Sequence, residues 1–282
     1  MKLIAESGSS RTEWCLVEGI YVIEHTFTEG INPFFQTRRE ISRSIRLQLP
    51  KVFFKKKIEK IYFYGAGCSS KEKKEIVSAS LVAQFKAPVE ANSDLLAAAR
   101  GLFGNEPGIA CILGTGSNSC FYDGENIVKN VRSLGYILGD EGSGAVLGKL
   151  FLSDCLKDIA PIALINLFYE KFRITPEEAL ESVYNRPFPN RFLATFSYFL
   201  IENIDNDYVR NLIYCNIKNF FVRNISQYDY RNYPVRFVGS GAKILSKMLR
   251  EVASEFGIEI KVIEETSMNG LVRYHTQSNQ LF

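Results

Sequence analysis

A short polar turn between two apolar runs is the first stretch whose residue types could do chemistry. Ile109–Leu113 and Ser119–Tyr122 are β-type runs, and the sequence GTGSN at 114–118 lies between them. Small residues let backbone N–H groups approach an anion, an approach that bulky side chains would obstruct. An ordinary hairpin turn has the same composition. The turn therefore indicates an anion site only if a partner turn exists elsewhere in the chain.

That partner lies near the N-terminus. Lys2–Ala5 and Thr12–Val17 are β-type runs, and the polar sequence ESGSSR at 6–11 separates them. The two turns could face each other across an interdomain cleft and offer backbone N–H and hydroxyl donors to a polyphosphate. Neither is a P-loop, because no GxxxxGK(S/T) occurs, and neither is a dinucleotide fingerprint, because each turn leads to a strand.

The elements that must position these turns alternate between strand and helix. In the first half, apolar patterns predict strands over 2–5, 12–17, 21–28, 58–64 and 88–91, and helices over 37–49, 71–85 and 94–103. In the second half they predict strands over 109–113, 120–123, 126–131, 235–238 and 258–263, and helices over 159–172, 175–183, 191–204, 209–228, 242–256 and 269–275. Prolines at 187 and 189 are expected to break the helical region. The pattern predicts an α/β fold whose two halves each open with three strands.

Composition excludes several classes of protein. With 282 residues and a net charge of +3, the chain is long enough for one or two domains and too weakly basic to indicate a nucleic-acid partner. No stretch approaches the roughly 18 apolar residues of a membrane span, and the N-terminus lacks the apolar core of a signal peptide. The six cysteines form no CxxC pair and are expected to be buried free thiols. We expect a soluble cytoplasmic protein.

Four segments in order carry a family resemblance. They are LIAESGSSRT at 3–12, LGTGSN at 113–118, GYILGDEGS at 135–143 and VGSG at 238–241. Through them the chain resembles the N-acetylglucosamine kinase-like group, related to the BadF/BadG/BcrA/BcrD ATPases, within the sugar kinase–actin–Hsp70 ATPase superfamily. The combination of GTGSN with GDEGS is typical of the amino-sugar kinase branch.

The resemblance implies two ribonuclease-H-like (actin-like ATPase) domains around a cleft. They are expected at 1–107 and 108–267, with a helical insertion at about 141–228 and a C-terminal helix at about 268–282 that packs back on the first domain. It also implies ATP and Mg²⁺ as cofactors, a small sugar as the second substrate, with N-acetylglucosamine the first candidate, and no nucleic-acid or membrane partner. A homodimer is expected through the helical insertion.

Asp94 is the candidate catalytic base. It follows a predicted strand and begins a predicted helix, where a carboxylate is stabilised by the helix dipole and is also common for purely structural reasons. The resemblance favours catalysis, with Asp94 accepting the proton of a sugar hydroxyl. It further implies phosphate binding by Gly8, Ser9, Ser10, Arg11, Thr12, Gly114, Thr115 and Gly116, adenosine binding by Gly239, Ser240 and Gly241, and sugar binding by Asn32, Asp94, Ser117, Asn118 and Asp140.

One departure from the family pattern concerns the metal. The family's first loop begins with an Asp that holds Mg²⁺ through water, and this chain has Glu6 there. The extra methylene could weaken metal positioning, which leaves open a non-catalytic sugar or nucleotide sensor. A second alternative is an activator ATPase of the BadF type, in which ATP hydrolysis drives electron transfer from an iron–sulfur cluster. The cysteines lack the spacing of cluster ligands, which argues against it.

Overall fold

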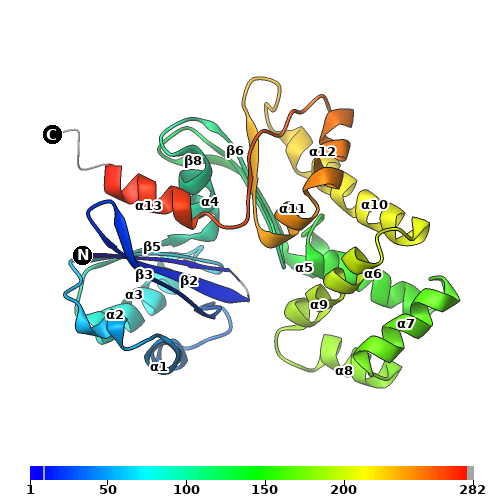
Figure 1. Ribbon diagram of the computed structural model, residues 1–282, viewed down its shortest axis with the longest axis horizontal. Helices are drawn as coiled ribbons and strands as arrows, with labels where there is room; N and C mark the ends of the chain where they lie inside the picture. Colours follow the sequence, from blue (N-terminus) through cyan, green and yellow to red (C-terminus); the bar gives the residue numbers. More distant parts are fainter. Residues whose placement is uncertain (9, 278–282) are drawn as a thin grey trace. The chain divides into compact units, whose positions relative to one another are not determined.

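The protein divides into two compact units, seen in a computed structural model that describes residues 1–8 and 10–277 (Figure 1). The first unit contains Met1–Ala110, Cys120–Lys129 and the C-terminal segment from Thr266. The second contains Cys111–Ser119 and Asn130–Glu265. The domain bounds expected from the sequence stay a prediction, and part of the expected C-terminal helix at 268–282 lies outside the described residues.

Ten strands of the described residues form two five-stranded sheets. The strands are β1 (Lys2–Ser7), β2 (Arg11–Glu18), β3 (Tyr21–Glu29), β4 (Lys60–Gly65), β5 (Val89–Ser93), β6 (Gly108–Leu113), β7 (Ser117–Tyr122), β8 (Ile127–Val131), β9 (Val235–Val238) and β10 (Ile263–Glu264). The first sheet has the order β3-β2-β1-β4-β5, and the second has the order β10-β9-β6-β7-β8. In the first sheet β1 pairs antiparallel with β2 and parallel with β4, so the hairpin turn after β1 lies at the end of a central strand.

Helices cover both faces of the first sheet (Figure 1). They are α1 (Arg38–Gln48), α2 (Val52–Lys55) and α3 (Lys71–Phe85) on one face, and α4 (Asp94–Phe103) and α13 (Met268–Gln277) on the other. Successive side chains of a strand point to opposite faces, so Leu3 joins the core under α1 and α3 while Ile4 joins the core under α4 and α13. A strand that is buried on both faces is apolar throughout, which explains the continuous apolar run at the start of β1.

Two glycines let α13 lie directly against α4. A Cβ atom on Gly270 would come within 1.8 Å of the carbonyl oxygen of Gly101. Any side chain there would push the helices apart, because the obstacle is backbone. This close packing brings Ser267, the residue before α13, into contact with Glu6 on β1.

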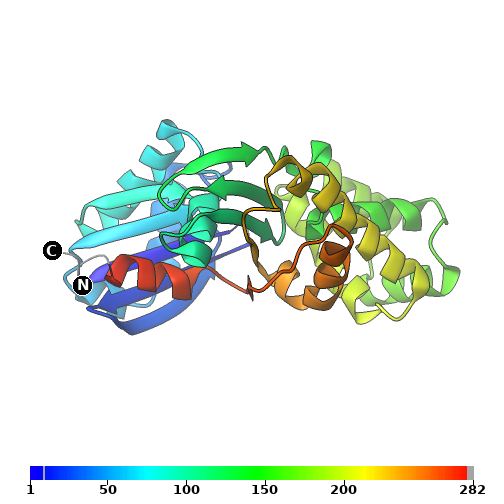
Figure 2. The same cartoon turned by 90° about the horizontal axis from the view of Figure 1, so that it is seen from above.

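The second unit is mainly helical. Its helices are α5 (Gly135–Leu138), α6 (Gly144–Leu156), α7 (Ile162–Phe172), α8 (Pro176–Tyr184), α9 (Pro189–Glu202), α10 (Asp207–Arg223), the 3₁₀ turn η1 (Ile225–Gln227), α11 (Ser240–Ile244) and α12 (Ser246–Glu255). Figure 2 shows α6 to α10 gathered in one bundle. Phe168 is central to it, with ring centroids 5.3 Å from Phe151 and 5.0 Å from Phe196 in edge-on contacts.

Several boundaries differ from those predicted. Strand β7 begins at Ser117, so Ser117 and Asn118 belong to a strand and the turn shrinks to residues 114–116. The helical region is interrupted at residues 185–188, as predicted, and Pro189 occupies the first position of α9, where its missing N–H has no helical partner to lose. The predicted helix 242–256 is two helices interrupted at Leu245, whose ψ of 19° leaves the helical range. The predicted strand 258–263 was wrong over residues 258–262, because β9 offers a partner only at Phe237 and Val238.

Two predictions made from the composition, on membrane spans and on the cysteines, can be checked within the described residues. None of the helices there is long and apolar enough to cross a membrane. All six cysteines are free thiols, as predicted. Five of them are buried, but Cys215 is exposed on α10, so the prediction of burial was wrong there.

Candidate active site

The first loop is a tight hairpin whose hydroxyl groups hold it to the neighbouring chain. The N–H of Gly8 donates to the carbonyl oxygen of Arg11 at 3.0 Å, which closes the turn. The hydroxyl oxygens of Ser7 and Thr12 lie 2.8 Å apart, and both side chains are fully buried. Thr12 donates to the carbonyl of Glu29, so its hydroxyl stabilises the hairpin. Gly8, by contrast, is exposed and accessible to a ligand. Of the other predicted phosphate-binding residues, Ser10 and Arg11 are exposed, and Ser9 lies outside the described residues.

Asn32 is held beside this loop by Ser7 and Gly67. The N–H of Ile31 donates to the Ser7 hydroxyl oxygen at 2.8 Å, which fixes the segment that carries Asn32. The Oδ1 atom of Asn32 accepts the N–H of Phe34 at 3.0 Å. Gly67 has φ +81°, and a Cβ atom there would lie 2.3 Å from that Oδ1 atom. Only glycine therefore leaves room for the Asn32 amide in this position.

Asp94 lies at the junction of β5 and α4. Ser93 caps the helix through its hydroxyl oxygen, which accepts the N–H of Leu96. Asp94 is the first residue of the helix, and its Oδ1 accepts the N–H of Leu95 at 2.9 Å. Burial raises the pKa of Asp94 to about 6, against the smaller opposing effect of this hydrogen bond. The carboxylate is thus a base poised just below neutral pH.

Glu6 shares the edge of β1 with two other carboxylates. It pairs in register with Glu13 on β2, and its oxygens accept the N–H and the hydroxyl of Ser267, both at 3.0 Å. Burial raises the pKa of Glu6 to about 7, and the negative charges of Glu13 and Asp94 add to the rise. Ser267 is a residue that sequence reasoning missed, because 261 positions separate it from Glu6.

The second loop lines a pocket inside the second unit. The N–H groups of Gly144 and Ala145, at the start of α6, donate to the carbonyl oxygens of Gly114 and Thr115 at 2.9 and 3.1 Å, which docks the loop on the helix. The residues that line the pocket are uncharged: Gly114, Thr115, Gly142, Ser143, Gly144, Leu147, Ala194, Ser197, Tyr198, Ile201, Ser240, Gly241, Ile244 and Leu245. One side therefore offers backbone and hydroxyl groups, and the other offers apolar walls from α9 and α11.

Glycines let the turn at 239–241 reach this pocket. Gly239 has φ +127°, and a Cβ atom on it would lie 2.1 Å from the carbonyl oxygen of Leu113. At Gly241 the same oxygen would lie 3.1 Å away. The structure thus brings together the second loop and Ser240-Gly241. The family resemblance implies that the loop binds phosphate and that Ser240 and Gly241 bind adenosine.

The loop before α6 carries Asp140 and is held by a buried asparagine. Asp140 has φ +55°, a left-handed conformation that aspartate tolerates better than most residues. A Cβ atom on Gly116 would lie 3.2 Å from the Oδ2 atom of Asp140, so this carboxylate lies against the second loop. Asn216 on α10 accepts the N–H of Gly142 at 3.0 Å and donates to the carbonyl of Ser143 at 3.1 Å. Nothing in the local sequence around Asn216 signals this role.

Ser117 and Asn118 lie at the start of β7. Ser117 is buried and Asn118 is half-buried. The Oδ1 atom of Asn118 accepts the N–H of Ser119 at 2.9 Å and the Nδ2 group of Asn130 at 2.9 Å. Asn130, on β8, is a further residue that the sequence analysis missed.

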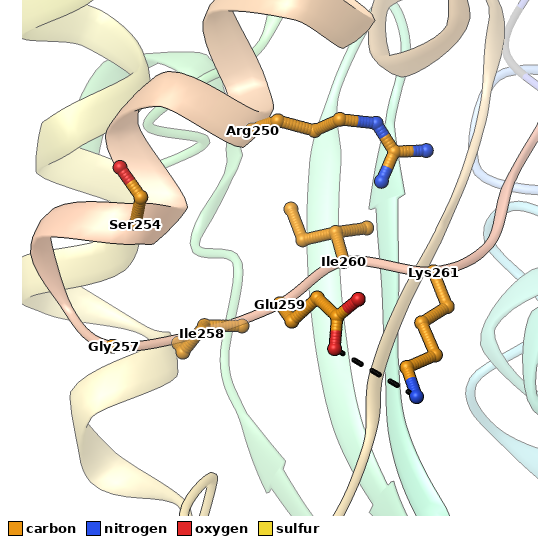
Figure 3. Close-up of a pocket in the computed structure, with 7 residues that line it drawn as sticks. All are labelled: Arg250, Ser254, Gly257, Ile258, Glu259, Ile260 and Lys261. Carbon is orange, nitrogen blue, oxygen red and sulfur yellow. Dashed lines mark ion pairs between the residues drawn. The ribbon is translucent and has the colours of Figure 1, made fainter.

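A separate hollow in the second unit contains none of the predicted site residues. It lies along α12 and the chain that follows it, and Figure 3 shows its lining residues Arg250, Ser254, Gly257, Ile258, Glu259, Ile260 and Lys261. Its one ion pair joins Lys261 to Glu259 at 3.7 Å, and both side chains are exposed. Exposed pairs of this kind contribute little to stability, because solvent screens them.

Comparisons with known proteins identify similar solved structures. No protein-family model matches the chain, and a search of curated proteins finds no match. Among solved structures, the chain is similar to a candidate N-acetylglucosamine kinase from Porphyromonas gingivalis, with 41% identity over 99% of this chain and 100% of that chain and a TM-score of 0.93.

Two more distant structures show the fold alone. A candidate N-acetylglucosamine kinase from Chromobacterium violaceum has 15% identity over 97% of this chain and 98% of its own, with a TM-score of 0.76. The ROK hexokinase from Thermus thermophilus has 12% identity over 96% of each chain, with a TM-score of 0.55. Together the three confirm the predicted α/β fold of two ribonuclease-H-like domains.

Proposed function

This chain belongs to the N-acetylglucosamine kinase-like family of the sugar kinase–actin–Hsp70 ATPase superfamily, and we propose that it phosphorylates an amino sugar with ATP. N-acetylglucosamine is the first candidate sugar, because the similar Porphyromonas gingivalis protein is described as a candidate kinase for it. The expected homodimer is part of the same proposal.

The observation that carries the proposal is the 41% identity to a candidate N-acetylglucosamine kinase over 99% of this chain, and the state of Asp94 supports it. Its pKa of about 6 leaves about nine-tenths of the carboxyl groups ionised at pH 7, while keeping them close enough to neutrality to accept a proton readily. In the proposed step the sugar hydroxyl oxygen forms a bond to the γ-phosphorus. The bond from that phosphorus to the β–γ bridging oxygen breaks, ADP leaves with the electron pair, and the hydroxyl proton moves to Asp94.

We assign the pocket of the second unit to the nucleotide. Backbone and hydroxyl donors of Thr115, Gly116 and Ser240 would bind phosphate and ribose oxygens, and the apolar side chains of Ile201 and Ile244 would cover the adenine ring. The exposed tip of the first loop, including Gly8, Ser10 and Arg11, is assigned to the phosphates of the same ATP. Phosphoryl transfer depends mainly on positioning and charge neutralisation, so these loops matter as much as the base.

The residues around Glu6 fit a magnesium ion. Glu13 keeps one buried carboxylate oxygen, Oε2, without a hydrogen-bond partner, and its charge disfavours ionisation of Glu6. A cation bound through water would relieve both effects. Mg²⁺ usually keeps several waters and is held by one or two carboxylates together with substrate phosphates. When bound, Mg²⁺ would neutralise charge on the transferring phosphate.

Sugar-dependent ADP release tests the proposal directly. We expect turnover with Mg-ATP and a panel of hexoses and amino sugars to be highest with N-acetylglucosamine. Thermal shift with each sugar, with and without Mg-ATP, gives an independent measure of binding, because a ligand that binds only the folded state raises its stability. Absence of turnover with every sugar would contradict the kinase assignment.

The non-catalytic alternative depends on Glu6. If Glu at this position had cost the protein its activity, Glu6→Asp should raise turnover by orders of magnitude. We expect instead a modest change, because Asp would lose the hydrogen bonds to Ser267. Glu18→Asp, at the exposed end of β2, is the matched control.

The activator-ATPase alternative needs accessible thiolates. Burial raises the pKa of Cys15, Cys68, Cys120 and Cys155 to about 12, so these groups stay protonated thiols. This observation favours the kinase over a protein that binds an iron–sulfur cluster.

A further inference from the structure

The sheet of the first unit carries two glutamates side by side. Glu6 on β1 and Glu13 on β2 are paired in register across the antiparallel hairpin. Side chains that are opposite each other in such a pair point to the same face and are close neighbours. Burial raises the pKa of Glu6, and the negative charge of Glu13 adds to the rise. The two carboxyl groups disfavour each other's charge, so a bound cation would stabilise both.

Both oxygens of Glu6 are engaged by the protein. Its Oε2 atom accepts the N–H of Ser267, and its Oε1 atom accepts the Ser267 hydroxyl, each at 3.0 Å. Ser267 directly precedes α13 and lies close to Gly101, where a Cβ atom would come within 2.6 Å of the Ser267 side chain. The carboxyl group of Glu6 therefore fastens the start of α13 to β1.

Glu13 has one oxygen engaged and one without a partner. The Nε2 atom of His25 lies 2.7 Å from the Oε1 atom of Glu13. The Oε2 atom is buried and has no hydrogen-bond partner within the described residues, and the whole side chain is only 10% exposed. A buried charged oxygen without a partner is costly, because burial removes its water and nothing replaces it. Buried charges in proteins are paired or bind metals, so this oxygen points to a cation.

His25 decides which oxygen of Glu13 has no partner. An ionised carboxylate only accepts hydrogen bonds, so the ring nitrogen that faces Oε1 carries the hydrogen. His25 lies on the neighbouring strand β3, in register with Cys15, and its ring meets Phe27 edge-on with a centroid distance of 4.9 Å. These contacts hold the carboxyl group in one orientation, as the hydrogen bonds around metal ligands do.

We infer that Glu13 is the residue whose carboxylate binds the divalent cation at the first loop, and that His25 is a positioning residue that leaves Oε2 for the metal. The inference rests on the proposed function, which brings Mg²⁺ to this loop. The family resemblance implies that Glu6 holds the ion through water, and Glu6 keeps that outer role here. Mg²⁺ is usually bound by one or two carboxylates together with waters and substrate phosphates, so one direct carboxylate suffices.

Binding of Mn²⁺ to the nucleotide-free protein tests the role of Glu13. Carboxylate and water ligands suit Mn²⁺ as they suit Mg²⁺, and electron paramagnetic resonance measures the unbound Mn²⁺. Glu13→Gln removes the charge and keeps the shape, and we expect it to raise the Kd for Mn²⁺ by about tenfold or more. Glu6→Gln keeps one oxygen for Ser267 and should raise this Kd by no more than about threefold, because its contact runs through water. Glu18→Gln, at the exposed end of β2, is the matched control.

Thermal unfolding gives a second measure of the same binding. Mn²⁺ should raise the unfolding midpoint of the wild type, of Glu6→Gln and of Glu18→Gln, because it binds only the folded state. It should leave the midpoint of Glu13→Gln unchanged. A glutamate that only stabilises the sheet would change the midpoint without metal and leave the shift caused by Mn²⁺ as it is in the wild type.

Two substitutions of His25 test the positioning role. In His25→Ala the loss of the hydrogen bond to Oε1 should raise the Kd for Mn²⁺ by about tenfold. In His25→Gln the side-chain amide can donate to the same oxygen, so part of the affinity should return. If the pair of His25 and Glu13 served only to join β3 to β2, His25→Ala would lower the unfolding free energy and leave the Kd unchanged.

Three results would overturn the inference: an unchanged Kd in Glu13→Gln, an unchanged Kd in His25→Ala, or a wild type that binds no Mn²⁺ at millimolar concentrations. A larger loss of affinity in Glu6→Gln than in Glu13→Gln would also overturn it, because the ion would then belong to Glu6. A protein that binds Mn²⁺ through Glu13 but phosphorylates no sugar would refute the kinase and support the inference on Glu13.

Discussion

The two loop regions have the same local architecture and opposite chemistry. Each lies in a strand–turn–strand at the start of one half of the chain. Around the first loop, burial raises the pKa of Glu6, and the negative charges of Glu13 and Asp94 add to the rise. The pocket around the second loop is lined only by uncharged residues. Under the proposed function, the first unit would handle protons and the charge of the metal, and the second would bind the nucleotide through neutral donors.

Removal of the base should give the largest effect. Asp94→Asn is isosteric and can keep the hydrogen bond from Leu95, so the first turn of α4 should be retained. We expect kcat to fall by about 10²–10⁴-fold, the usual contribution of a general base, with ATP affinity unchanged. Steady-state ADP release and calorimetric titration of ATP measure the two quantities. Asp123→Asn, in an exposed turn, is the control, and full activity of Asp94→Asn would refute the assignment.

The pH dependence should reveal the same carboxyl group. Asp94 works only when ionised, so log kcat/KM should rise by about one for each pH unit below 6 and level off above it. A profile measured from pH 5 to 8 checks this. If log kcat/KM rises equally steeply with pH in Asp94→Asn, the titration belongs to another group.

Glycine substitution should separate nucleotide binding from proton transfer. In Gly239→Ala the new methyl group would meet the carbonyl of Leu113 at 2.1 Å in a backbone conformation that alanine avoids, so ATP affinity should fall by tenfold or more. Gly241→Ala meets the same oxygen at 3.1 Å and should lose only a few-fold. Calorimetric titration with ATP measures the affinity of both variants. Equal losses of affinity would mean that the distance of the new methyl group from Leu113 does not determine how tightly ATP binds.

Acid should destabilise the first unit through His275. Its ring is buried, lies 2.8 Å from the Tyr64 hydroxyl and stacks on Tyr62 with a centroid distance of 3.7 Å. Burial, with a further effect of the positive charge of Arg100, lowers the pKa of His275 from 6.5 to about 3. Between these values the unfolded chain binds a proton that the folded protein does not, so this contribution is complete above pH 6.5 and is lost as the pH falls.

The expected size is about 1.4 kcal/mol of unfolding free energy per pH unit, or about 2 kcal/mol at pH 5. Urea unfolding of the wild type and of His275→Gln at pH 7 and pH 5 measures it as a difference, which removes the opposing contributions of Glu6 and Asp94. His275→Gln should be less stable at pH 7 and lose less on acidification. Identical losses in the two proteins would contradict the buried neutral histidine.

The sequence predicted secondary structure correctly where it depends on residues that are close together along the chain. The helices at 71–85 and 94–103 were predicted with the observed bounds, and in each a serine hydroxyl caps the first turn. The same reasoning failed where a distant segment decides the outcome. The end of β10 depends on the short partner β9, and the roles of Asn216 and Ser267 depend on contacts across 73 and 261 positions respectively.

The sequence by itself determined the two glycine-rich turns, the α/β order and the family, because these depend on residue type and spacing along the chain. Only the tertiary structure decided the protonation and the orientation of the side chains in the candidate site. The pKa of Asp94 depends on how much water folding removes from it, and the orientation of Asn118 depends on a donor that a neighbouring strand supplies. Protonation and orientation are set by surroundings in space, and sequence spacing does not report those surroundings.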